Sequence, residues 1–355
     1  MNRICQSSYG NLEAVINFAG HEGNPERALV HFFRDRRTGK WDTANIISLD
    51  PLSGGSIIQN CTKWRKGQEH GNFEVVVLEK DGLMMHYTRD NTIPVNNGID
   101  AWRVPTIVNL DEHPQYGKVV ACGAAPLLQS NLPANNSCHG ITLETVLITD
   151  TGDAMHYRCA QQNDPKDMSP QWKLANRITD GATGPACLFQ SSRDHLNALV
   201  PRCDGITEFT FERGVWSRTR HIMAARGPAC TFAPNPSHPT IHIILRKSDQ
   251  FCVATKITYD DGNKALWSTL SQVPSPLRST LLSPHHNDCP GHPMAIVSQS
   301  LETLGHSPNA EAIVFHPCGT GWQDLWMILH WSHLTASQDW VVSGVVMGEV
   351  NGCPM

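Results

Sequence analysis

The stretch GNFEVVVLEKDGLMMHYTRD, Gly71 to Asp90, predicts a β-hairpin. Two runs rich in valine, methionine and tyrosine flank Lys80-Asp81-Gly82, and an Asp-Gly pair between such runs is a strong signal for a tight turn. Similar hairpins recur on both sides of this one, so the fold follows from a repeat.

The copies agree strand by strand. The second strands begin in the same style, at Gly10-Asn11-Leu12-Glu13-Ala14-Val15, Gly71-Asn72-Phe73-Glu74-Val75-Val76 and Gly140-Ile141-Thr142-Leu143-Glu144-Thr145-Val146. The third strands share a histidine followed by an aromatic residue, in His31-Phe32, His86-Tyr87 and His156-Tyr157. A loop and then a tryptophan follow each third strand, at Trp41, Trp102 and Trp172.

A further strand precedes each hairpin. GPACLFQSS (residues 184–192) recurs as GPACTFAPN (227–235), and the N-terminal ICQSSYGNLEAV has the same Gln-Ser-Ser step. The fourth unit ends at Trp216, the fifth at Trp267, and a sixth runs from Pro293 through Glu311 to Trp340. The repeating unit therefore has four strands.

Six such units in 355 residues average about 59 residues, somewhat more than the roughly 40 to 50 residues of familiar propeller repeats. Period-2 alternation and the absence of helical periodicity argue against helical solenoids, and four-stranded units that stack radially form a β-propeller. We predict an all-β protein, one propeller domain over residues 1–355 with six blades. Its terminal strands are expected to pair and close the ring, with the apolar run 341–347 placed to do so.

The predicted blades cover about 1–52, 53–120, 121–182, 183–226, 227–285 and 286–355. Five or seven blades, or two packed β-sandwiches, are the alternatives.

Charge and hydropathy exclude two classes of partner. The chain has 28 basic and 33 acidic residues, a net charge of -5, and no basic stripe, so nucleic acid is not expected as a partner. No segment approaches the roughly 18 apolar residues of a membrane span. A homo-oligomer is compatible with the sequence.

Twelve dispersed cysteines without a CxxC motif favour disulfides and an oxidising compartment. Two sequons, Asn60-Cys61-Thr62 and Asn135-Asn136-Ser137, predict glycosylation at Asn60 and Asn135. Together these features predict a secreted or secretory-pathway protein whose signal peptide lies outside this sequence. The alternative is a cytosolic protein with buried free thiols.

The repeated residues have a structural interpretation and a functional one. As scaffold, one histidine of each unit faces a neighbouring blade and the tryptophans fill the space between blades. As binding sites, they would form a multivalent lectin in which Arg34, Arg89 and Arg158 help to hold sugars. The fourth and fifth units do not reproduce these arginines, which favours one central pocket.

Familiar catalytic motifs are scarce, since the chain has no GxSxG, HExxH, P-loop or GxGxxG pattern. Asp81, Asp204 and Asp249 fall in predicted turns, so a glycosidase with paired carboxylates has little support. The segment His285-His286-Asn287-Asp288-Cys289 is interpreted as a solvated turn. We expect no metal and no cofactor.

The EVVV-type second strand, the HYxRD-type third strand and the closing tryptophan resemble repeats of secreted fungal β-propeller proteins. Among these are the hetero-Diels-Alderases of tropolonic sesquiterpene biosynthesis. The resemblance implies a cofactor-free pericyclase with small hydrophobic substrates, which joins a tropolone-type ortho-quinone methide to the alkene of a humulene-type terpene. A carbohydrate-binding lectin is the alternative, and a hydrolase comes third.

In propellers the usual site is the mouth of the central channel, which is framed by two kinds of connection. These join strands two and three of a blade, and strand four to strand one of the next blade. We predict that Arg226, His113 and Tyr116 act as catalytic donors to a polarised oxygen. The predicted substrate-binding residues are His21, Arg27, His285, His286 and Trp322, the last by stacking on a flat ring.

Overall fold

The protein is described here from a computed structural model. It describes residues 4–18, 28–60, 71–80, 82–91, 102, 105–108, 117–120, 125–130, 142–160, 171–192, 195–223, 226–232, 240–247, 250–258, 265–267, 271–272, 292–298, 310–317, 325–334 and 339–351. From residue 222 onward the description covers the backbone of the strands.

The described strands form six antiparallel sheets, which are the blades numbered 1 to 6, and each blade is contiguous in the chain. Blade 1 has β1 (Ile4–Gln6), β2 (Leu12–Phe18), β3 (Ala28–Arg34) and β4 (Trp41–Ser48). Blade 2 has β5 (Ser56–Gln59), β6 (Phe73–Leu78), β7 (Met84–Arg89) and β8 (Thr106–Ile107). Blade 3 has β9 (Leu127–Ser130), β10 (Thr142–Ile148), β11 (Ala154–Ala160) and β12 (Gln171–Thr179).

The second half of the chain repeats this order. Blade 4 has β13 (Cys187–Ser192), β14 (His195–Arg202), β15 (Gly205–Glu212) and β16 (Val215–Met223). Blade 5 has β17 (Arg226–Phe232), β18 (Thr240–Lys247), β19 (Gln250–Thr258) and β20 (Ala265–Trp267), with the short β21 (Ser271–Gln272) also paired to β19. Blade 6 has β22 (His292–Ser298), β23 (Ala310–Pro317), β24 (Leu325–Leu334) and β25 (Asp339–Asn351).

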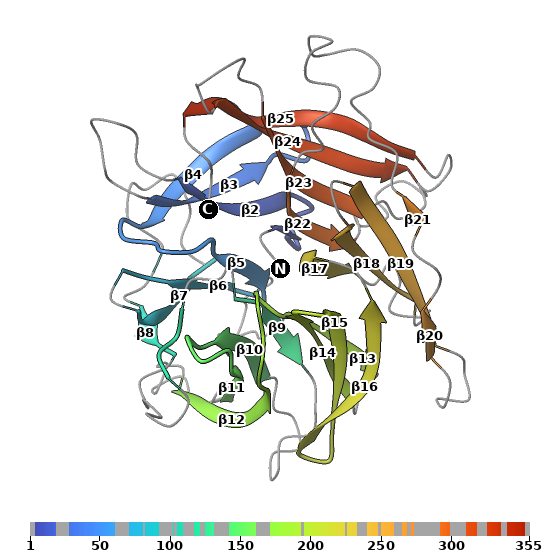
Figure 1. Cartoon of the computed structure of the whole chain (residues 1–355). Helices are drawn as coiled ribbons and strands as arrows, with labels where there is room; N and C mark the ends of the chain where they lie inside the picture. Colours follow the sequence, from blue (N-terminus) through green and yellow to red (C-terminus); the bar gives the residue numbers. More distant parts are fainter. Residues whose placement is uncertain are drawn as a thin grey trace.

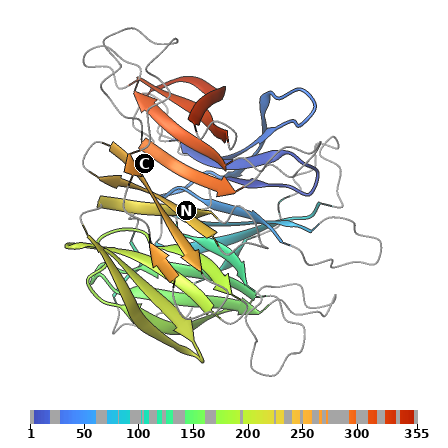
Figure 2. The same ribbon diagram turned by 90° about the vertical axis from the view of Figure 1, so that its right-hand side faces the viewer.

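The first strands of the blades form a closed ring around one axis. β1 contacts β5, and the contacts continue through β9, β13, β17 and β22 back to β1. Figure 1 looks roughly along this axis, with the inner strands near the centre, and Figure 2 shows the ring from the side. The predicted all-β propeller is confirmed, and the described strands form six blades.

The predicted mode of closure is wrong. β1 pairs with β2 of its own blade and β25 pairs with β24, so among the described residues the two terminal strands do not pair with each other. Blade 6 instead packs against blade 1, with β22 against β1 and β25 against β4. The physical reason is that every blade is built from one contiguous repeat, so no strand is left over to complete another sheet.

One register recurs in all six blades. On each third strand, the same position pairs with the tryptophan of the fourth strand. The pairs are Arg34–Trp41, Arg89–Trp102, Cys159–Trp172, Phe211–Trp216, Lys256–Trp267 and His333–Trp340. Blade 5 begins with Arg226, the first residue of β17.

The hydrophobic core lies between blades. Val15 and Leu29 of blade 1 pack with Phe73 and Trp102 of blade 2 in one cluster, and equivalent clusters join blades 2 and 3 and blades 3 and 4. This arrangement follows from the sequence, because a sheet with apolar residues on both faces buries them only between two neighbours. Within the described residues, no helix is long and apolar enough to span a membrane.

The cysteines whose side chains are described do not form the expected disulfides. Cys5 and Cys203 carry free thiols, and Cys159 and Cys187 are buried thiols of the core. Burial raises the pKa of the Cys5 and Cys159 thiols well above the ordinary value, with nearby glutamates adding to the effect. For Cys5, Cys159 and Cys187 the alternative of buried thiols describes the structure better, because their strands pack them among apolar side chains. Cys203 is exposed in the turn after β14.

Asn60 does not suit the predicted glycosylation. Its side chain is 2% exposed, its Nδ2 donates to Glu74, and its Oδ1 accepts the backbone N–H of Asn72 at 3.1 Å. The folded structure therefore leaves no access to the nitrogen that would carry a glycan. Asn135 lies outside the described residues.

Candidate functional site

The repeated histidines each bind a glutamate of the neighbouring strand in the same blade. The Nε2–Oε2 distances are 2.9 Å for His31–Glu13, 2.9 Å for His86–Glu74 and 2.8 Å for His156–Glu144. All six side chains are buried at the face that meets the next blade. A buried carboxylate needs such partners, because desolvation without them is costly.

In two of the three pairs, the tryptophan of the next blade binds the other histidine nitrogen. Trp172 Nε1 donates to His86 Nδ1, and Trp216 Nε1 donates to His156 Nδ1, both at 3.2 Å and with nearly perpendicular rings. Because an indole N–H can only donate, Nδ1 must be the acceptor nitrogen and Nε2 must carry the proton given to the glutamate. We call this arrangement the Trp-His-Glu relay.

The other described interfaces vary this arrangement. Between blades 1 and 2, His31 and Trp102 meet edge to face, with centroids 5.8 Å apart. In blade 4, Asn197 replaces the glutamate and Glu208 replaces the histidine, and Asn197 Nδ2 donates to Glu208 Oε1 at 3.1 Å. The structural interpretation of the repeated histidines and tryptophans is confirmed where their side chains are described.

The three arginines of the lectin interpretation are also occupied. Arg34 Nε donates to the carbonyl oxygen of Gly39 at 3.0 Å, within its own turn. Arg89 is buried over the ring of Phe73, and burial lowers the pKa of its guanidinium. Arg158 Nε donates to both carboxylate oxygens of Glu144 at 3.1 Å, and its guanidinium lies over Phe211 of blade 4. Arg34 and Arg89 are engaged within their own blades, and Arg158 joins blade 3 to blade 4. The three do not form a row of open guanidinium groups.

Two kinds of connection meet at one end of the ring. The segments leaving blades 1, 2 and 3 each bond to the second strand, or to the turn that follows it, in the next blade. Lys80 N donates to Asp50 O at 3.0 Å, Asp150 N to Lys118 O at 2.7 Å, and Thr183 N to Pro201 O at 2.9 Å. This end, which we call the mouth end, is the one on which the sequence places the site.

Arg226 is the first residue of β17, the inner strand of blade 5, and pairs with Arg246 of β18. This position is at the mouth end and beside the axis, although its side chain is not described. The other predicted site residues, His21, Arg27, His113, Tyr116, His285, His286 and Trp322, lie outside the described residues. The strands that flank them end at the mouth end.

The residues that follow Tyr116 are firmly held. Gly117 has a φ of 79°, and a Cβ there would lie 2.1 Å from Asp150 Oδ1, so only glycine fits. Lys118 N donates to the same oxygen at 3.0 Å. The connection that carries His113 and Tyr116 is therefore anchored to blade 3 immediately after these residues.

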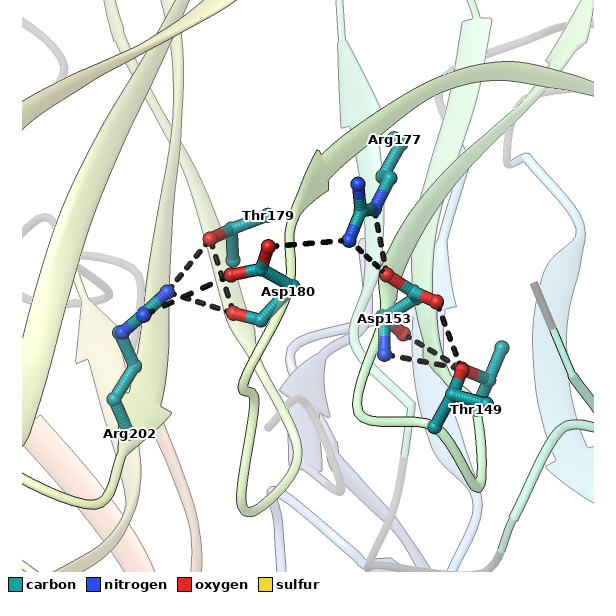
Figure 3. A network of polar contacts seen from close by, with 7 residues as sticks. Thr149, Asp153, Arg177, Thr179, Asp180 and Arg202 are labelled. Carbon is teal, nitrogen blue, oxygen red and sulfur yellow. Dashed lines mark hydrogen bonds and ion pairs between the residues drawn. The ribbon is translucent and has the colours of Figure 1, made fainter. Parts of the chain in front are cut away.

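A polar network ties blades 3 and 4 together at the mouth end (Figure 3). Arg177 Nε donates to Asp153 Oδ1 at 2.6 Å, and its guanidinium also approaches Asp180 at 3.3 Å. Arg202 of blade 4 donates to Thr179 Oγ1 and to the carbonyl oxygen of Asp180, both at 2.7 Å. Both arginines are engaged by their neighbours, so this network holds the scaffold beside the mouth.

A small apolar pocket lies at the same end, where blades 2, 3 and 4 meet. Its volume is about 10 Å³, which is room for a single water molecule. The residues that line it are Leu78, Met84, Val119, Val120, Ala125, Val146, Leu147, Ile148 and Pro185. Within the described part of the chain, no group of three or more histidine, cysteine, aspartate or glutamate side chains could hold a metal ion.

The sequence interpretation missed the glutamates that bind the repeated histidines. Glu13, Glu74 and Glu144 stand at one fixed position of the second strand, and the residue two positions later pairs with the histidine in each blade. An acidic residue repeated at one place in otherwise apolar strands was the available signal, because such a carboxylate is buried only with a partner.

The chain matches no known family, and no curated protein is similar to it in sequence. Solved structures are similar in fold. AofleA from Arthrobotrys oligospora has a TM-score of 0.56 at 10% identity, covering 98% of this chain and 89% of that one. The SapL1 lectin in complex with alpha methyl fucoside has a TM-score of 0.51 at 12% identity, covering 96% and 98%.

A protein of unknown function from Dyadobacter fermentans has a TM-score of 0.52 at 10% identity, with 90% of each chain covered. The chain shares the fold of these proteins. At such low identity the likeness concerns the propeller scaffold alone.

Proposed function

We propose that this protein is a cofactor-independent pericyclase with a single site at the mouth of the propeller. The observation that carries the proposal is the burial of the repeated polar residues. The Glu-His pairs and their tryptophans contact one another between blades, so these side chains are not open to a ligand. A ligand-binding site repeated in every blade would need these side chains to be accessible to the ligand. A single site is then built from the connections that differ between blades.

The reaction that we propose is the intermolecular hetero-Diels-Alder addition of a tropolone-type ortho-quinone methide to a humulene-type alkene. One carbon–carbon bond and one carbon–oxygen bond form together, and no proton or electron is exchanged with the protein. A pocket that holds both partners in register contributes several kcal/mol through proximity.

A donor to the oxygen of the heterodiene lowers the barrier further. Arg226 stands at the start of the inner strand of blade 5, and we assign it this role together with His113 and Tyr116. His21, Arg27, His285, His286 and Trp322 are proposed to surround the substrates. A secretory-pathway location belongs to the same proposal.

The test is to incubate the protein with both partners and to measure the cycloadduct by chiral chromatography. We expect faster formation of one stereoisomer, and we expect Arg226→Gln to lower the rate by about a hundredfold, as for loss of one donor to a developing oxyanion. The matched control is Arg220→Gln, an exposed arginine of the outer strand β16. A racemic product at the uncatalysed rate overturns the proposal.

A carbohydrate-binding lectin is the second candidate. Its specific support is that the SapL1 structure, which covers nearly the whole chain, is a lectin in complex with alpha methyl fucoside. Titration with methyl fucoside separates the two candidates, because a lectin binds it saturably and the proposed pericyclase does not.

A further inference from the structure

Three buried polar atoms at the interface between blades 1 and 2 have no hydrogen-bond partner among the described residues. They are His31 Nδ1, Arg89 Nε and Trp102 Nε1, and the three residues are 0%, 6% and 8% exposed. Burial of a donor or an acceptor without a hydrogen bond is costly, and most such groups in folded proteins have a partner. A partner that is not a side chain therefore has to be considered.

Strand register and ring contacts bring the three atoms to one place. Phe73, Arg89 and Trp102 form one row across blade 2, with their side chains on the same face of the sheet. His31 of blade 1 contacts both ends of this row, with ring centroids 5.7 Å from Phe73 and 5.8 Å from Trp102. The Arg89 guanidinium carbon lies 5.6 Å from the centroid of Phe73. Arg89, in the middle of the row, therefore lies beside the His31 ring.

The middle residue of the row distinguishes this interface from the next two. The corresponding rows are Leu143, Cys159 and Trp172 in blade 3, and Leu196, Phe211 and Trp216 in blade 4. There the indole N–H donates directly to the histidine, and the ring centroids are 5.5 and 5.3 Å apart. With arginine in the middle, the rings of His31 and Trp102 are farther apart and make no direct hydrogen bond.

The bonding capacities of the three atoms define the ligand. The N–H groups of Arg89 Nε and Trp102 Nε1 can only donate. His31 Nε2 lies 2.9 Å from the Glu13 carboxylate and gives its proton to it, so Nδ1 of the neutral ring is an acceptor. The ligand has to accept two hydrogen bonds and donate one. A water molecule can do so, whereas a halide or a carboxylate has no proton to donate.

The local charge also favours a neutral ligand. Burial lowers the pKa of the Arg89 guanidinium, and the nearby Glu13 carboxylate opposes this shift. The buried cation therefore already has an anion close to it, and a second anion would leave an excess of negative charge.

We propose that the interface between blades 1 and 2 contains a binding site for one water molecule, which accepts from Arg89 and Trp102 and donates to His31 Nδ1. Buried waters typically make about three hydrogen bonds to groups that otherwise have no partner. The water takes the place of the direct bond between tryptophan and histidine, so a Trp-water-His-Glu chain joins blade 2 to blade 1. Arg89 distinguishes this interface, because cysteine or phenylalanine at its position accompanies the direct bond.

The test is nuclear magnetic resonance of protein labelled with ¹⁵N at the ten tryptophan indoles, with cross-relaxation measured from water to each indole proton. Trp102→Phe identifies the Trp102 signal. We expect the Trp102 indole proton to show nuclear Overhauser effects of opposite sign in the laboratory and rotating frames, the signature of a long-lived bound water. The indoles of Trp172 and Trp216 donate directly to histidines and should show neither effect.

Two leucine variants locate the water. Arg89→Leu removes one of its three partners and should abolish the cross-peak at Trp102. Arg34→Leu, at the same register position of blade 1, is the control and should leave the cross-peak in place. The remaining indole signals report whether each variant is folded, and a cross-peak that persists in folded Arg89→Leu contradicts the proposal.

The unaltered protein decides even if Arg89→Leu does not fold. The absence of a water cross-peak at its Trp102 indole overturns the proposal. A Trp102 signal that shifts saturably when chloride is added to chloride-free buffer also overturns it, because the site would then hold an anion.

Discussion

A buried histidine with a partner on each nitrogen is costly to replace. His156 donates to Glu144 at 2.8 Å and accepts from Trp216 at 3.2 Å, and the Glu144 carboxylate is fully buried. Removing the imidazole takes one hydrogen-bond donor from the charged Glu144 carboxylate and takes the acceptor from the Trp216 indole N–H. Arg158 still binds Glu144, which limits the loss.

We expect His156→Leu to lower the free energy of unfolding by about 3 kcal/mol, as when a buried charged acceptor loses a hydrogen-bond partner. His195→Leu is the control, because His195 is over a third exposed and lies 3.6 Å from Glu212, so its loss should cost less than about 1 kcal/mol. Equilibrium unfolding in urea measures both. Equal costs for the two variants would contradict the role of the relay.

Cysteine reactivity should follow burial. Because burial raises the pKa of the Cys5 and Cys159 thiols, few of them are thiolates even at pH 9, and reagent has no access to them. Cys203 is exposed and should be alkylated in the native protein. Mass spectrometry of alkylated peptides should find Cys203 modified within minutes, and Cys5 and Cys159 modified only after denaturation. Rapid labelling of Cys159 in the folded protein would be inconsistent with the packing described.

At the scale of elements, the sequence predicted the hairpins well because their turns are chemically distinct. Gly82, with a φ of 76°, occupies the tight turn expected between β6 and β7. It predicted closure wrongly because apolar runs such as 341–347 reveal that a strand is buried and not which strand it pairs with. The predicted site residues rest on loop position alone, because the loop sequences do not repeat from blade to blade and so offer no second copy for comparison.

The strength of the contact between the fourth-strand tryptophan and the histidine of the preceding blade should depend on the hydrogen bond between them. A double-mutant cycle on His86 and Trp172, which are bonded at 3.2 Å, should give a coupling free energy about 1 kcal/mol larger than the same cycle on His31 and Trp102. The second pair is in edge contact without a hydrogen bond, so it is a matched reference. Unfolding free energies of the single and double variants provide the measurement, and equal couplings would assign the whole effect to packing.

At the scale of the molecule, the propeller separates scaffold from function. Groups that recur, such as the Glu-His pairs, are buried in the contacts between blades. The connections at the mouth end differ from blade to blade. A ring of similar blades can therefore carry one site instead of six. The fold alone does not distinguish a catalyst from a lectin, because both use the same scaffold.

The number and class of ligands bound by one chain test this account most directly. Native mass spectrometry should be carried out with two panels, hydrophobic terpene or tropolone compounds and simple glycans that include methyl fucoside. A single site at the mouth predicts one apolar ligand per chain and no glycan. Several fucosides bound to each chain, with no apolar ligand, would contradict the account and establish sites between the blades.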